Sequence, residues 1–122
     1  MREIEFEQAV VDLAHTFGWR AGGWRAAKTD KGWRTPVKYD GHGFPDLTLV
    51  HTRGIVIFAE LKVGSNKLSP EQTVWQYHLT HAECSAAKEA AIPQIRYRLW
   101  YPKHSNSIAR ELSFGRLTTW NI

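Results

Sequence analysis

The stretch from Gly43 to Gly64, "GFPDLTLVHTRGIVIFAELKVG", limits the fold of this chain more than any other feature. It contains two apolar, strand-like runs on either side of Thr52-Arg53-Gly54. A glycine in the third position of a three-residue loop suits the left-handed residue of a turn with a bulge. The stretch therefore predicts an antiparallel hairpin, with strands at about residues 46–51 and 55–62.

The turn also predicts which residues of the two strands face each other. If His51 pairs with Ile55, Asp46 lies directly opposite Glu60. Directly opposed side chains have Cβ atoms about 4.5–5.5 Å apart. Lys62 shares the face of Glu60 because side chains alternate along a strand. A slip of one residue in the register would turn these side chains to the other face.

Two opposed carboxylates repel each other, so the pair needs a cation nearby. Lys62 supplies one positive charge, and Mg²⁺, which prefers oxygen ligands, supplies two. Such an ion lowers the pKa of a bound water and polarises a phosphoryl oxygen. Lys62 could then hold the attacking water or offset charge on the phosphate. The alternative is a solvated strand end with a simple Lys–Glu pair.

The first predicted helix, residues 3–17, adds a third acidic side chain. Its apolar residues recur at helical spacing: Phe6, Val10, Leu13, Ala14 and Phe17. Glu3 has the spacing of that stripe, Glu7 borders it and Glu5 lies off it. We expect Glu3 to face the carboxylate pair as a metal ligand, with Glu7 second and Glu5 last. The alternative is that these acids have no role in a site and lie there because negative charge is favourable near the N-terminus of a helix.

The rest of the chain alternates helices and strands. A strand is expected at residues 19–27, a loop at 28–45, a strand in "QIRYRLWY" and a last helix in "SNSIAREL". Ser69 is a good N-cap, with Pro70 at the first position of a long helix that "CSAAKEAA" continues or follows. The order α-β-β-β-α-β-α predicts an α/β fold with a mixed β-sheet flanked by helices. The length suits one domain, residues 1–122.

The charge is distributed unevenly. Between Gly18 and Pro45 there are six cationic residues, two anionic residues and three interleaved tryptophans. Cations neutralise phosphates and indoles stack on bases. We therefore predict contact with DNA for Trp24, Arg25, Trp33 and Arg34, and also for Lys67 in the later loop "GSNKLSP". The alternative is a solvated loop with a few structural tryptophans.

Other sequence features bear on the cellular location and on further ligands. No apolar run approaches the roughly 20 residues that span a bilayer, so no membrane partner is expected. The first residues do not resemble a signal peptide, and Cys84 is the single cysteine, so we expect a cytoplasmic protein without internal disulfides. His78, His81 and Cys84 have helical spacing that could bind zinc, but a fourth ligand is not evident.

Pro45-Asp46, followed after thirteen residues by Glu60-Leu61-Lys62, resembles the PD-(D/E)XK nuclease signature. With the acidic first helix, "GFPDL" and "LSPEQ", nearly the whole chain is similar to the VRR-NUC family. The resemblance implies a restriction-endonuclease-like core that hydrolyses DNA phosphodiester bonds with Mg²⁺ or Mn²⁺. By position it implies metal ligands and catalytic residues: Glu3, Asp46, Glu60 and the backbone carbonyl of Leu61 for the metal, Lys62 for the water and Gln72 for the scissile phosphate.

The resemblance also suggests a substrate and a setting. It implies branched DNA such as a four-way Holliday junction, a homodimer, and DNA repair or replication in the cytoplasm of a phage or its bacterial host. Residues 21–42 and 81–94 are longer than the corresponding family segments, which could alter DNA binding. The alternatives are a restriction-type or flap nuclease, or a catalytically silent DNA-binding module that uses the hairpin only structurally.

Overall fold

The computed structural model describes residues 1–24, 27–34, 37–90, 92 and 94–122. Its helices are α1 (Glu3–Thr16), α2 (Pro70–Glu89) and α3 (Ser105–Leu112), with a short 3-10 helix η1 (Pro102–His104). Its strands are β1 (Arg20–Gly23), β2 (Ala27–Thr29), β3 (Gly32–Arg34), β4 (Leu47–His51), β5 (Ile55–Leu61) and β6 (Ile95–Trp100). The predicted first and last helices and the strands around the hairpin turn are therefore present.

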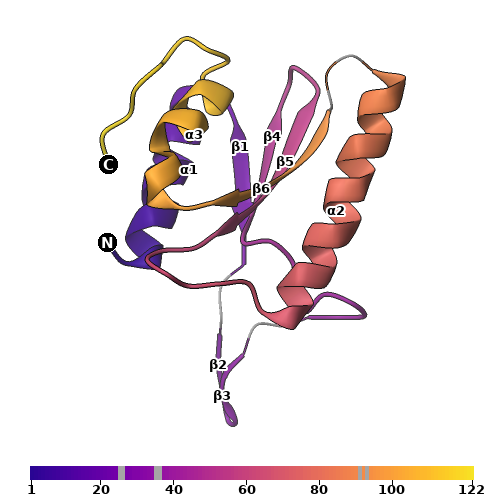
Figure 1. The fold of residues 1–122 in the computed structure, drawn as a ribbon. Coiled ribbons are helices and arrows are strands. Elements are labelled where there is room, and N and C mark those ends of the chain that lie inside the picture. Colours follow the sequence, from indigo (N-terminus) through magenta and orange to yellow (C-terminus); the bar gives the residue numbers. More distant parts are fainter. Residues whose placement is uncertain (25–26, 35–36, 91, 93) are drawn as a thin grey trace.

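A mixed sheet organises the fold, with strand order β1-β4-β5-β6 (Figure 1). β4 pairs antiparallel with both β1 and β5, whereas β6 pairs parallel with β5. A parallel pair needs a long crossover connection, and α2 provides it. The predicted α/β class with a mixed sheet flanked by helices is confirmed, whereas the restriction-endonuclease-like core stays a prediction.

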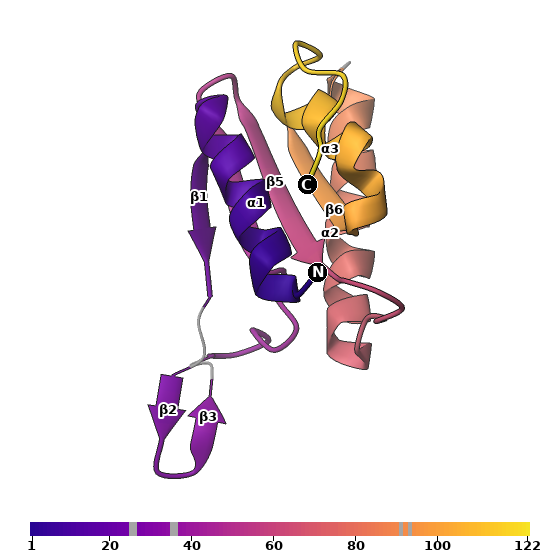
Figure 2. The same cartoon turned by 90° about the vertical axis from the view of Figure 1, so that its left-hand side faces the viewer.

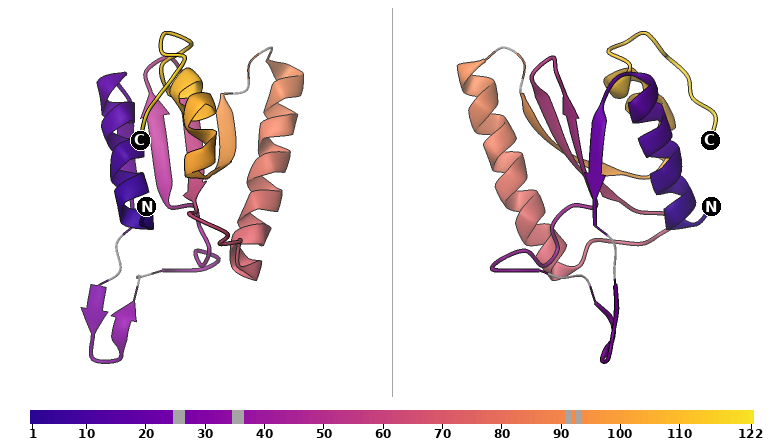
Figure 3. Two further views of the ribbon diagram at one scale, coloured as in Figure 1. Left: turned by 60° about the vertical axis from the view of Figure 1, so that its left-hand side comes forward. Right: turned by 180° about the vertical axis from the view of Figure 1, so that it is seen from behind.

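The helices cover the two faces of the sheet unequally. α1 and α3 lie on one face, and α2 runs on the other side next to β6 (Figures 2 and 3). Strand residues directed toward α1 and α3 are buried: Leu47, Leu49, Ile57, Ala59 and Leu61. Side-chain alternation places Thr48, Phe58 and Glu60 on the opposite face. No residue of α2 is fully buried, so this second face is less completely covered.

The β4–β5 hairpin has the predicted register. His51 pairs with Ile55, and Leu47 pairs with Ala59. Gly54 has a φ of +90°, and its N–H donates to the carbonyl of His51 at 3.0 Å. A glycine adopts this backbone conformation without a steric penalty. Continuing the register by one residue places Asp46 opposite Glu60.

The prediction of a loop over residues 28–45 is wrong for its first part. β2 and β3 form a separate antiparallel hairpin, which stands apart from the main sheet beyond the end at which α1 begins (Figure 2). The expected strand over 19–27 is also shorter, because β1 ends at Gly23. A hairpin that does not cover the core needs no alternating apolar face, so the pattern used for the prediction gave no signal. We call residues 27–34 the arm.

β6 lies at the edge of the sheet, and α2 caps its open side. The backbone N–H of Tyr97 donates to Oε1 of Glu83 on α2 at 2.9 Å. Arg98 donates to the same carboxylate at 3.0 Å and to Glu111 on α3 at 2.8 Å. The bond to Glu83 satisfies the backbone N–H of Tyr97, which at the edge of the sheet could otherwise pair with a strand of another chain. These bonds also tie α2 and α3 to the strand between them.

Candidate functional site

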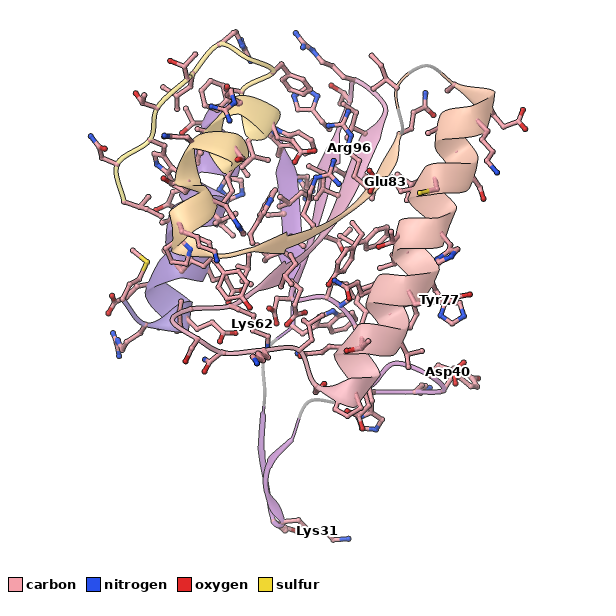
Figure 4. All side chains as sticks on the ribbon, in the orientation of Figure 1. Lys31, Asp40, Lys62, Tyr77, Glu83 and Arg96 are labelled. Atoms are coloured by element: carbon pink, nitrogen blue, oxygen red, sulfur yellow. The ribbon has the colours of Figure 1, made fainter. Side chains whose placement is uncertain are left out.

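The predicted site residues meet at the end of the sheet opposite the β4–β5 turn. Asp46 directly precedes β4, Glu60 is the penultimate residue of β5, and Lys62 directly follows β5. Figure 4 shows Lys62 at this end, with Lys31 farther out at the tip of the arm. Side chains at the ends of strands can lie outside the apolar core, while the backbone hydrogen bonds of the sheet still fix their positions.

Asp46 is fixed by a hydrogen bond to the neighbouring strand. Its Oδ2 accepts from the backbone N–H of Leu61 at 2.9 Å. The side chain of Leu61 is buried in the core, so its backbone is the part that reaches the site. The bond joins the start of β4 to the end of β5 and therefore holds the Asp46 carboxylate beside Glu60.

Glu60 is an acid in a nearly dry environment, with 1% of its surface exposed. Its Oε1 accepts a hydrogen bond from Nε2 of Gln72 at 2.9 Å and lies 3.7 Å from Nζ of Lys62. Burial first, and then the charge of Asp46, raise the pKa of Glu60 to about 8. Without a further cation, Glu60 therefore keeps its proton at neutral pH.

The second oxygen of Glu60 is suited to a cation. Among the described residues, no donor group reaches the buried Oε2 of Glu60, whereas a side-chain hydrogen bond between the Glu60 and Asp46 carboxyls helps to raise the pKa of Glu60. When Glu60 loses its proton, Oε2 becomes a buried polar atom without a partner, which costs about 1–3 kcal/mol. A divalent ion beside it would remove that cost and offset the charges of Glu60 and Asp46. Paired carboxylate oxygens suit Mg²⁺ or Mn²⁺.

The carboxylate pair is not a complete ligand set. In the ranges that the structure describes, no three side chains of the His, Cys, Asp or Glu type converge closely enough to hold a metal ion. Mg²⁺ sites commonly use one or two carboxylates, with water and substrate phosphate oxygens as the other ligands. The donor set of Asp46, Glu60 and the Leu61 backbone fits this kind of site.

Gln72 is directed at Glu60 by the start of α2. Oγ of Ser69 accepts from the N–H of Gln72 at 3.2 Å, and Oε1 of Gln72 accepts from the N–H of Ser69 at 2.8 Å. This is a capping box, which satisfies two backbone donors at the helix start. Because Oε1 of Gln72 is engaged, its Nε2 is left to donate to Glu60. The amide thus faces the site, as the resemblance implies, and it contacts the Glu60 carboxylate there. Its contact with a scissile phosphate stays a prediction.

The three acids of α1 differ in position. Glu5 forms an exposed ion pair with Arg2 at 2.7 Å and does not join the site. Glu3 was expected on the core-facing stripe, but it is exposed because it begins the helix, one turn ahead of the first buried residue, Phe6. Partial burial and the charge of Asp46 nevertheless raise the pKa of Glu3. Glu3 is thus near the pair without being enclosed.

Glu7 is at least as well placed as Glu3. It is half-buried, and its Oε1 lies 3.6 Å from the point that a Cβ atom on Gly23 would occupy. Burial, followed by the charges of Asp46 and Glu3, raises its pKa. Helical spacing alone could not separate the two acids, because that choice depends on how α1 crosses the end of the sheet.

Tyr97 is a further neighbour of the acids, on the adjacent strand β6. It pairs with Phe58 in the ladder, two residues before Glu60, so it belongs to the same face of the sheet. It is buried, and burial, followed by the charges of Glu60 and Asp46, raises its pKa. The strand alternation of residues 95–100 would have given this placement if the parallel register had been known.

The predicted DNA contacts are only partly described. The indole of Trp24 is 60% exposed and meets the ring of Phe44 edge-on, with centroids 6.0 Å apart. Lys67 is exposed in the loop before α2. Arg25 and the side chains of Trp33 and Arg34 lie outside the described part of the chain.

The alternative zinc site on α2 has no geometric support in the described residues. Nδ1 of His78 lies 3.0 Å from the carbonyl of Val74, and Nδ1 of His81 lies 2.7 Å from the carbonyl of Tyr77. These are local bonds within one helix. They leave the two imidazoles on an exposed surface, and Cys84 is exposed as well.

The fold and the site define an α/β protein with a partly buried cluster of two acids and a lysine at one end of a mixed sheet. A scan against models of known protein families finds no match, and a comparison with curated proteins finds no similar sequence. None of the helices in the described ranges combines the length and the apolar character needed to cross a bilayer.

Proposed function

We propose that this chain is a metal-dependent DNA endonuclease that hydrolyses phosphodiester bonds. The observation that carries the proposal is the buried Glu60, whose Oε2 is reached by no donor group of the described residues and which lies beside Asp46 and Lys62. A buried acid next to a second acid is unfavourable for folding, and an apolar side chain would fit such a place at lower cost. Acids with strongly shifted pKa values cluster at functional sites. The resemblance to the VRR-NUC family supports the same conclusion.

Three groups would hold the ion: Asp46, Glu60 and the backbone carbonyl of Leu61. Glu3 or Glu7 from α1 would add negative charge beside them. Mg²⁺ or Mn²⁺ bound there would act as a Lewis acid that polarises a phosphoryl oxygen and offsets its charge. Glu60 must lose its proton for this, and the ion itself favours that loss.

The other side chains would position the reacting groups. Lys62 donates a hydrogen bond to the attacking water and stabilises negative charge that develops on the phosphate. The water oxygen forms a bond to phosphorus, the bond from phosphorus to the 3′ oxygen breaks, and a proton passes from the water to the departing oxygen by way of solvent. The products carry a 5′-phosphate and a 3′-hydroxyl. Gln72 keeps Oε1 of Glu60 turned toward α2, which leaves Oε2 for the ion.

Branched DNA is the proposed substrate class, and a homodimer that cuts a four-way junction is the proposed form. The arm belongs to the basic, tryptophan-containing segment between Gly18 and Pro45 and projects from the end of the sheet that carries the site (Figures 1 and 4). A positively charged extension at this place suits DNA phosphates on either side of the scissile bond. Restriction-type and flap nucleases would share the site and differ in substrate.

A catalytically silent DNA-binding module is the second candidate. The observation that favours it is the lack, among the described residues, of three converging side chains able to hold a metal. Such a module would use the same basic segment and would keep Glu60 protonated beside Gln72.

Cleavage of defined DNA tests the proposal. A four-way junction, a flap and a plain duplex are incubated with the protein in Mg²⁺ and, separately, in EDTA. We expect nicks in the junction with Mg²⁺ alone, and no cleavage by Asp46→Asn. Binding without cleavage under every condition would support the silent module. Cleavage in EDTA, or full activity of Asp46→Asn, would contradict the assigned site.

A further inference from the structure

An exposed tyrosine occupies a strained position close to α2. Tyr39 has a φ of +56° and is 96% exposed. It is the first central residue of a tight turn in which the N–H of Gly41 donates to the carbonyl of Lys38 at 3.0 Å. A turn with positive φ at this position strongly favours glycine, because a side chain there is sterically strained. Tyrosine at this place therefore lowers the stability of the fold.

Phe114 shows how such strain is normally compensated. It has a φ of +55°, and its ring stacks on Trp19 with centroids 5.6 Å apart. The same ring packs against His51 and lies under the guanidinium of Arg53 at 4.2 Å. The ring of Tyr39 has no such contact with any residue that the structure describes. Nothing in the described part of the chain thus compensates the strain at Tyr39, which points to a partner outside the chain.

The turn is held rigidly against α2. Nε1 of Trp75 donates to the carbonyl of Asp40 at 2.9 Å, and Figure 4 shows Asp40 beside the first turns of this helix. A Cβ atom on Gly43 would lie 2.5 Å from the backbone carbon of Glu71, so the loop touches the helix backbone directly. Gln72, the next residue of α2, donates to Glu60. The turn that carries Tyr39 is therefore in a fixed position relative to the candidate site.

We propose that Tyr39 is a preformed stacking platform for an unpaired nucleobase of the DNA substrate. An aromatic ring on a fixed backbone can stack on a base at a low cost in entropy, and every base offers a π-face. The surrounding segment from Gly18 to Pro45, with six cations against two anions, attracts the phosphates that accompany the base. A paired base is already stacked on its neighbours, so Tyr39 selects a branch point or a frayed end. This inference rests on the proposed function in taking DNA as the ligand.

Variants of Tyr39 can separate the ring from the strain. Tyr39→Gly and Tyr39→Asn remove the ring and suit positive φ, so both should fold with a melting temperature equal to or above that of the wild type. Tyr39→Phe keeps the ring and is the matched control. The probes are a forked DNA with 2-aminopurine at the first unpaired position and a fully paired duplex of equal length. Binding is followed in EDTA by fluorescence anisotropy and by quenching of 2-aminopurine.

We expect the wild type and Tyr39→Phe to quench 2-aminopurine and to prefer the fork. Tyr39→Gly and Tyr39→Asn should lose the quenching and bind the fork about 5- to 100-fold more weakly, with little change for the duplex. Equal affinity of all variants for the fork would overturn the inference. An equal loss on both probes would do so too, as would altered self-association of Tyr39→Gly in place of altered DNA binding.

DNA cleavage in Mg²⁺ tests the proposed nuclease function independently of the role of Tyr39. A wild type that cuts DNA while Tyr39→Gly binds the fork normally would leave the nuclease assignment in place and remove the role of Tyr39. If the wild type never cuts DNA but Tyr39→Gly loses fork binding, the role of Tyr39 would stand and the nuclease assignment would be removed.

Discussion

The side-chain amide of Gln72 donates a hydrogen bond to Oε1 of Glu60 across 2.9 Å. One residue caps a helix and the other lies near the end of a strand on the facing sheet, so the bond joins α2 to β5 at the candidate site. The capping box with Ser69 fixes the direction of the amide. Consequently the start of α2 determines that Oε1 of Glu60 accepts the hydrogen bond from Gln72 and that Oε2 is left for an ion.

The first prediction concerns this bond. Gln72→Ala should lower the free energy of unfolding by about 1–3 kcal/mol, because both the helix cap and the partner of a buried oxygen are lost. It should also slow DNA cleavage by about 10- to 100-fold, as expected for a group that orients a metal ligand. Urea unfolding and initial cleavage rates measure the two effects. Glu71→Ala, one residue away on the exposed side of α2, is the control and should change neither quantity appreciably.

The second prediction concerns pH and the raised pKa of Glu60. In EDTA, the free energy of unfolding should fall as the pH rises from about 4.5 to about 8. In that range the folded protein retains a proton on Glu60 that the unfolded chain has released, so deprotonation favours unfolding. Glu3 and Glu7, whose pKa values are also raised, contribute with the same sign.

Glu60→Gln isolates the contribution of this one group. Its stability should change less with pH than that of the wild type, and the difference between the two proteins should grow from pH 4.5 to pH 8. Chemical denaturation at several pH values gives both curves. Parallel curves for the two proteins would mean that Glu60 is ionised in the folded state over the whole range, against its assigned environment.

The third prediction separates catalysis from metal binding at Lys62. Lys62→Met keeps the aliphatic part of the side chain and removes the charge that lies 3.7 Å from Glu60. Cleavage should fall by about 100-fold or more, which is typical of the loss of one group that stabilises transition-state charge. Mn²⁺ should bind at least as tightly, because a competing positive charge is gone. Lys88→Met, near the far end of α2, is the charge-matched control.

Titration calorimetry with Mn²⁺ and single-turnover cleavage together test Lys62→Met. A variant that cuts DNA at the wild-type rate would exclude Lys62 from the reaction. A variant that loses Mn²⁺ binding would show that Lys62 is needed for the structure of the site and not for the chemical step.

The fourth prediction concerns the arm. β2 and β3 pair with each other and not with the main sheet, so replacing residues 27–34 by a short Gly-Ser linker should leave the unfolding transition nearly unchanged. DNA affinity should fall, and the dependence of log K on log salt should become shallower by about one for each cation that contacts a phosphate. Arg110→Gln, on the exposed surface of α3, controls for a general loss of positive charge. An unchanged salt dependence would exclude the arm from the DNA interface.

The hairpin that carries the site could be predicted in detail from the sequence. Gly54 set the turn, the alternation of apolar residues set the faces, and together they placed Asp46 opposite Glu60. Ser69 and Pro70 likewise marked the start of α2 because helix caps are local. In these places a few adjacent residues decide the structure.

Features that depend on packing between distant segments could not be predicted. The burial of Glu60 depends on how α2 lies over the sheet, and the choice between Glu3 and Glu7 depends on where α1 begins relative to Asp46. The bonds from Arg98 to Glu83 and Glu111 join three elements that no sequence spacing relates. The arm was missed for a different reason, since it lacks the apolar periodicity that marks strands in a core.

The central claim is that Asp46 and Glu60 together bind a divalent ion, and the most direct test is anomalous diffraction from crystals of the protein soaked in Mn²⁺. We predict an anomalous peak between the two carboxylates, within bonding distance of Oε2 of Glu60, and its loss in Asp46→Asn crystals treated in the same way. An empty site in wild-type crystals that hold Mn²⁺ elsewhere would contradict the claim.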